Sequence, residues 1–170
     1  MAGGSGFFDD PLPHLVEAFF RPEFYTLPNE GEMKVLVHTF FEGAVLAKEK
    51  TAYKMSLQYV KCVLELVDIC KDRKEDGYKD VYKDNISEIL LLRGTLAYLV
   101  SDTVLAESSF DRYRSINSKP LLKASSYAQQ TPLAFVVGDF ETTVSYSLKC
   151  LALLGVDVPE IGGDISQQIK

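Results

Sequence analysis

Apolar residues recur at helical spacing along most of this 170-residue chain. Val37, Phe40 and Ala44 lie three or four positions apart, and so do Val60 and Leu64 further along. This spacing places them on one side of a helix, which has about 3.6 residues per turn. The strict alternation of apolar and polar residues that indicates β-strands is absent. The pattern predicts an all-α fold, with helices over about residues 29–50, 51–73, 85–99, 104–114, 120–137 and 142–154.

Capping residues mark the ends of these predicted helices. Asn29 and Asp102 suit N-caps, because their side chains accept hydrogen bonds from the free N–H groups of a first turn. Pro120 suits the first position of a helix, and Gly155 suits the end of the last one. These signals predict an N-terminal segment with a short helix (1–28), a helical domain (29–157) and a flexible C-terminal tail (158–170).

A densely charged stretch, residues 71–84, interrupts the apolar pattern. Gly77 inside it suits a helix end. The four residues from Asn85 to Glu88 resemble a capping box at the start of the next helix. We therefore expect residues 71–84 to form a charged connection between two helices.

The second helices of three successive pairs carry similar residues. Ser56, Ala106 and Thr143 place a small side chain at the same point of each. Phe110 follows Ala106 by four positions, and Gly138 opens a Gly-Asp-aromatic turn before the third helix. In these features the chain resembles the tetratricopeptide repeat family. The small residues are 50 and 37 positions apart, against a family period of about 34, so an ordinary helical bundle stays open as the alternative.

The resemblance implies a short solenoid of stacked antiparallel helix pairs, because one pair cannot bury its own apolar face. It also implies a concave surface, lined by the first helix of each pair, that holds a peptide or helix of another protein. The candidate partner-binding residues that map onto this surface are His38, Phe41, Val45, Leu91, Thr95, Tyr98 and Phe135. Their largely apolar character favours an apolar helix or peptide over a charged chain end. The alternative is that the larger apolar side chains among them belong to the core.

Composition and charge narrow the function classes. Hydrophobic residues make up 46% of the chain and charged residues 25%, which is typical of a globular protein. The net charge of −6 disfavours binding to nucleic acid. The apolar stretches fall short of the roughly 18 residues that a membrane span needs. Three cysteines without Cys-X-X-Cys spacing indicate reduced thiols in a cytoplasmic protein and no zinc site.

Catalytic chemistry has few candidates here. His14 and His38 are the only histidines, and they lie in different predicted helices. No nucleophile, metal-binding or phosphate-binding motif occurs, so we expect no catalytic residue, no metal and no cofactor. The sequence thus predicts a non-catalytic adaptor, chaperone or scaffold subunit that binds another protein, with homo- or hetero-oligomers possible. A carrier of a small apolar ligand and an obligate subunit of a larger assembly are the alternatives.

Overall fold

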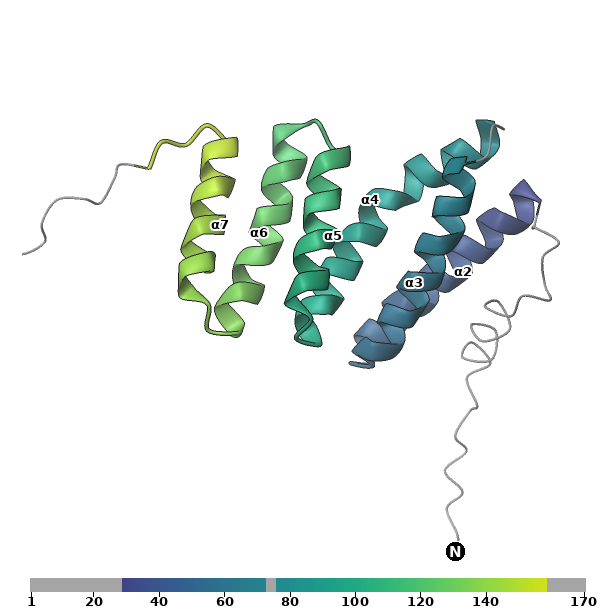
Figure 1. The fold of residues 1–170 in the computed structure, drawn as a ribbon, viewed down its shortest axis with the longest axis horizontal. Coiled ribbons are helices and arrows are strands. Elements are labelled where there is room, and N and C mark those ends of the chain that lie inside the picture. The colour runs from purple at the N-terminus through teal and green to yellow at the C-terminus, as the bar shows by residue number, and fades with distance from the viewer. Residues whose placement is uncertain (1–28, 73–75, 159–170) are drawn as a thin grey trace, which may run out of the picture.

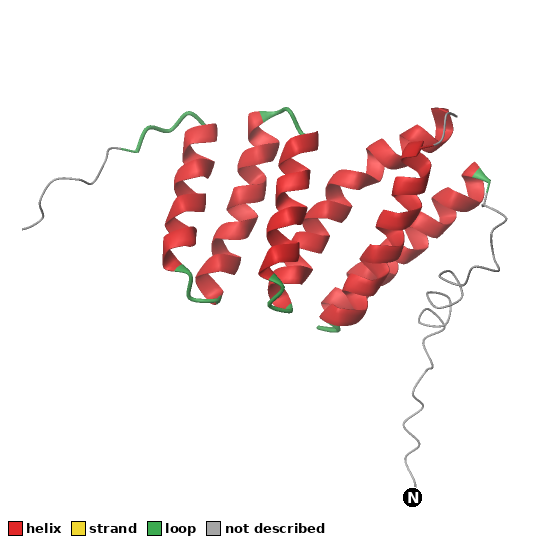
Figure 2. Cartoon of the chain, in the orientation of Figure 1, coloured by secondary structure: helices red, strands yellow, loops and turns green. Residues whose placement is uncertain are grey.

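The computed structural model of the chain describes residues 29–72 and 76–158, and this part is all-helical (Figure 2). Helices account for 85% of it, and no strand occurs among the described residues. The predicted fold class is confirmed. The predicted short helix within residues 1–28 and the tail beyond residue 158 lie outside the described residues. The helices are α2 (Glu30–Glu49), α3 (Tyr53–Asp72), α4 (Asp76–Leu99), α5 (Thr103–Ile116), α6 (Pro120–Val136) and α7 (Phe140–Leu153).

These helices form three antiparallel pairs that stand beside one another in chain order (Figure 1). Each helix packs mainly against its neighbours in the sequence, and α4 and α6 also contact the pair that precedes them. The two ends of the row are α2 and α7. In this arrangement the first helix of each later pair packs over the pair that precedes it.

Side-chain caps start three of the helices, at Asn29 and Asp102 as the sequence predicts and at Asp139, which was not predicted as a cap. Asn29 accepts a hydrogen bond from the Glu32 backbone N–H, and the Glu32 carboxylate accepts one from the Asn29 N–H, which completes a capping box. Asp102 and Asp139 cap α5 and α7 by accepting from the third residue of each helix. Pro120 is the first residue of α6.

The same tight turn joins the two helices of each pair. In every case a residue of positive φ follows the first helix, at 60° for Thr51, 65° for Ser101 and 82° for Gly138. The next residue donates its backbone N–H to the carbonyl of a buried alanine five positions earlier, at 2.8–3.0 Å, as in a Schellman motif. The three acceptors are Ala47, Ala97 and Ala134. Corresponding residues are thus 50 positions apart between the first two pairs and 37 between the last two.

The charged segment is the part of the fold that the sequence analysis misjudged. We expected residues 71–84 to connect two helices, but α4 begins at Asp76, so residues 76–84 are helical and no helix begins at Asn85. Lys79 and Lys83 have high helix propensity, and the single Gly77 costs only about 1 kcal/mol. Continuation into the apolar half of α4 outweighs that cost. Both α3 and α4 are longer than their counterparts α5 and α6, and together they account for the longer first interval.

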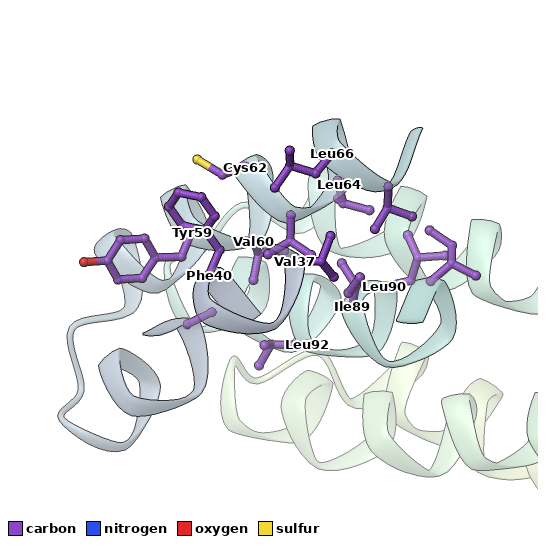
Figure 3. Packing of buried hydrophobic residues seen from close by; sticks show 14 of the residues in the cluster. Val37, Phe40, Tyr59, Val60, Cys62, Leu64, Leu66, Ile89, Leu90 and Leu92 are labelled. Carbon is purple, nitrogen blue, oxygen red and sulfur yellow. The ribbon is translucent and has the colours of Figure 1, made fainter. Parts of the chain in front are cut away.

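Buried side chains concentrate toward the N-terminal end of the row. The larger core cluster joins α2, α3 and α4 (Figure 3), where the rings of Phe40 and Tyr59 lie 6.4 Å apart. A smaller cluster forms around Tyr98 and Phe110 between α4 and α5, with Leu133 of α6 packed against it. Among the large hydrophobic side chains of α7, only Tyr146 is buried. Burial therefore decreases toward α7.

Small residues set how closely the helices of a pair cross. Ser56 is fully buried, and its hydroxyl donates to the Ala44 carbonyl of the facing helix at 2.6 Å. Ala106 is also fully buried. Gly94 lies directly against the Phe110 ring, and a Cβ atom there would come within 2.6 Å of a ring carbon. The crossing of α4 and α5 therefore leaves no room for a side chain at position 94.

We predict that Gly94→Ala lowers the free energy of unfolding, because the added methyl group displaces the Phe110 ring. Gly31→Ala is the matched control, since its Cβ atom would have only an ordinary 3.4 Å contact. Both substitutions add helix propensity, so their difference, expected at about 1–3 kcal/mol, measures the overpacking cost. Urea unfolding followed by circular dichroism measures both variants. Equal stabilities would show that the α4–α5 crossing is looser than described.

Candidate partner-binding site

The seven candidate residues differ widely in exposure. His38 on α2 is exposed. Phe135 near the end of α6 is 59% exposed, whereas Tyr98 near the end of α4 is only 6% exposed. The remaining four are half-buried: Phe41, Val45, Leu91 and Thr95. The structure thus does not bring all seven together on one open surface.

Tyr98 is a core residue. Its ring packs against Phe110 at 6.3 Å between centroids, and Leu133 of α6 closes the same cluster. Burial raises the pKa of Tyr146 on α7, and a hydrogen bond with Tyr98 raises this pKa further. The prediction that Tyr98 lines the open concave surface is therefore wrong, and the alternative, that this side chain belongs to the core, applies. The third helix pair covers the second one and buries this side chain.

Phe135 occupies the place of Tyr98 in the next pair. The two residues are 37 positions apart, as are the turns that follow them. No helix among the described residues covers Phe135, and its ring meets Phe140 edge to face at 5.7 Å and 74°. The position that is core in the second pair is therefore exposed in the third.

A groove of about 520 Å³ runs between α6 and α7 beside Phe135. Its lining contains no charged side chain. Ser147 and Cys150 stand where the second pair carries the rings of Phe110 and Tyr113, so the smaller side chains leave a hollow. We name this site the end groove. It is lined by Ala128, Thr131, Pro132, Phe135, Thr143, Ser147, Cys150 and Leu151.

The hydroxyl groups of the end groove are already hydrogen-bonded. Thr131 donates to the Tyr127 carbonyl at 2.9 Å, and Thr143 donates to the Asp139 carbonyl at 2.7 Å. Ser147 donates to the Thr143 carbonyl at 2.9 Å. Because each hydroxyl bonds to the backbone of its own helix, the groove offers mainly carbon surface. The binding free energy of an occupant would therefore come mainly from apolar contacts.

Exposed hydrophobic side chains gather around this part of the chain. Of the sixteen large ones that are exposed in the described residues, eleven lie between positions 121 and 158. Isolated exposed hydrophobic residues are ordinary, and of these eleven only Phe135 also lines the end groove. The eleven are Leu121, Leu122, Phe135, Val136, Val137, Phe140, Val144, Leu148, Leu154, Val156 and Val158.

The titratable groups of the described residues show no assembled reactive centre. Burial raises the pKa of the Cys62 thiol to about 11, so this thiol stays protonated near neutral pH. His38 lies alone on α2, and His14 lies outside the described residues. No group of three histidine, cysteine or acidic residues in this part is placed to hold a metal ion. None of the described helices is long and apolar enough to cross a membrane.

Comparison with protein families, curated proteins and solved structures finds no match for this chain. The candidate site is therefore assigned from the geometry of this chain alone. Phe135 was predictable from the sequence, but most of the end groove around it was not predicted. The available signal was the 37-residue interval, which pairs Ser147 with Phe110 and so predicts a hollow in the third pair.

We predict that Tyr98→Ala and Phe135→Ala differ sharply in stability although both residues occupy the same position of a pair. Tyr98→Ala should lower the free energy of unfolding by about 3–5 kcal/mol, because it opens a cavity against Phe110. Phe135→Ala should change it by less than about 0.5 kcal/mol, since the ring is exposed. Chemical denaturation of both variants tests this contrast. Similar losses would mean that Phe135 is also covered.

Proposed function

We propose that this chain is a non-catalytic protein-interaction module, acting as an adaptor or scaffold subunit, and that it binds an apolar helix of a partner in the end groove. The observation that carries the proposal is the 59% exposure of Phe135 against 6% for Tyr98 at the corresponding position. When another apolar surface covers this ring and the uncharged groove beside it, apolar area is removed from water, which favours binding.

The rest of the fold supports a helix as the occupant. The groove of the second pair is covered by α6, whose Leu133 packs against the cluster of Tyr98 and Phe110. A partner helix in the end groove would make the same kind of contact with α6 and α7. Ser147, in the place of Phe110, leaves space for a large apolar side chain from that partner.

The other candidate positions keep a secondary role in this proposal. His38, Phe41, Val45, Leu91 and Thr95 lie on the first helices of the first two pairs and retain at least partial exposure. They stay predicted partner-binding residues, which would contact those parts of a longer partner segment that extend beyond the end groove. A cytoplasmic location, suggested by the reduced thiols, remains part of the proposal.

The test compares capture of partners from the native source by the full chain and two variants. Phe135→Asp places a charge in the end groove, and Val35→Asp is the matched control because Val35 is 64% exposed on α2, at the other end of the row. We expect at least one protein to be recovered by the parent and by Val35→Asp but lost with Phe135→Asp. A helical segment of that protein should bind Phe135→Ala roughly thirtyfold more weakly, which corresponds to about 2 kcal/mol for an aromatic anchor.

Two outcomes would contradict the proposal. Recovery of every captured protein by all three forms would show that the end groove is not a binding site. Light scattering that reveals a dimer in the parent and a monomer in Phe135→Asp would show that a second copy of the chain covers the groove instead.

A further inference from the structure

A second hollow, of about 560 Å³, lies between α5, α6 and α7. Its lining carries three cationic side chains and no carboxylate, in a chain whose net charge is −6. Its α7 residues, Lys149, Ala152 and Leu153, project from the side of the helix opposite to the end groove. We name this hollow the basic pocket. It is lined by Arg114, Ser115, Lys123, Tyr127, Lys149, Ala152 and Leu153.

Arg114 is held rigidly at the wall of the basic pocket. One terminal nitrogen donates to the Ser126 hydroxyl at 3.2 Å and to the Gln130 side-chain oxygen, and the other donates to Asp111 at 2.6 Å. The side chain is only 13% exposed. A guanidinium carries five N–H donors, and these bonds use three. The Nε–H and one terminal N–H therefore have no acceptor among the described residues.

The lysines of the basic pocket lack carboxylate partners. Neither Lys123 nor Lys149 forms an ion pair in the described part of the chain. Lys149 instead lies 5.8 Å from the centre of the Tyr127 ring and 5.7 Å from that of Tyr146, and the Arg114 guanidinium carbon lies 4.3 Å from the Tyr127 ring. Ring contacts hold both cations in place, but only Arg114 also has a carboxylate partner, Asp111, and the charge of Lys149 has none among the described residues.

The first turn of α6 offers little to a phosphate group. Pro120 has no backbone N–H, and the N–H groups of Leu122 and Lys123 already donate to the Lys119 carbonyl. Recognition therefore falls to side-chain cations. A single exposed ion pair contributes at most about 1 kcal/mol, so one small anion would bind weakly. A chain segment with several carboxylates can contact all three cations at once.

From this geometry we propose that the basic pocket binds an acidic peptide segment of a partner protein, through Asp or Glu carboxylates placed between Arg114, Lys123 and Lys149. The Nε–H and the remaining terminal N–H of Arg114 can donate two hydrogen bonds to one carboxylate. This proposal does not depend on the end groove, because the two sites lie on opposite sides of α7. A partner could use either site alone.

The test measures binding of a fluorescein-labelled hexaglutamate peptide to the full chain at low ionic strength, by fluorescence anisotropy. Arg114 is left intact, because its bonds to α6 make it structural. The double variant Lys123→Gln and Lys149→Gln should weaken binding about 3- to 30-fold. The matched control, Lys50→Gln and Lys54→Gln, removes two exposed lysines of the first helix pair and should leave affinity within about twofold. Peptide binding should also shift the Tyr127 ring resonances.

Three results would overturn this proposal. A hexaglutamine peptide that binds as tightly as hexaglutamate would remove the role of the carboxylates. Equal losses in the two double variants would show attraction to the whole chain instead of a site. Inorganic phosphate that shifts the Tyr127 resonances at lower concentration than the peptide would make the pocket a phosphate site. Phe135→Asp should leave hexaglutamate binding unchanged, so failure here and failure of the end groove are distinguishable.

Discussion

The fold depends on how closely the two helices of each pair cross. In the second pair Gly94 lets the Phe110 ring lie against the backbone of α4, and in the first pair the Ser56 hydroxyl reaches the Ala44 carbonyl. Such contacts require small residues, because interiors are close-packed and an extra methyl group has nowhere to go. The repeated turn fixes the same geometry by returning the chain after one residue of positive φ. Each pair is therefore a rigid unit with an apolar face that it cannot bury by itself.

Stacking follows from that limit. The first helix of the next pair buries what the preceding pair leaves open, as α6 does when Leu133 packs against the cluster that contains Tyr98 and Phe110. At the third pair the described helices end with α7, and the corresponding face remains open beside Phe135. The difference in exposure between Tyr98 and Phe135 thus results from the arrangement of neighbours. The amino-acid type alone does not determine it.

This dependence on neighbours explains how far sequence reasoning could go. Helix starts at Asn29, Asp102 and Pro120 and the small residues at the crossings were predictable, because a cap or a close contact restricts residue type locally. The helical start of α4 at Asp76 was not, because a charged stretch suits a solvated helix as well as a loop. Nor was the burial of Tyr98, since an aromatic residue on a first helix lines a groove or fills a core according to the helix that covers it.

The two sites divide the surface of α7 by chemistry. Toward the end of the row this helix presents Thr143, Ser147 and Leu151, with the hydroxyls turned back to their own backbone, so a ligand meets carbon. On the opposite side Lys149 lies against two tyrosine rings and forms no ion pair among the described residues. Tyr146 is the only large side chain of α7 that is buried, and this helix packs mainly against α6. A ligand that binds only the folded helix stabilises it by mass action, whichever of the two sites it occupies.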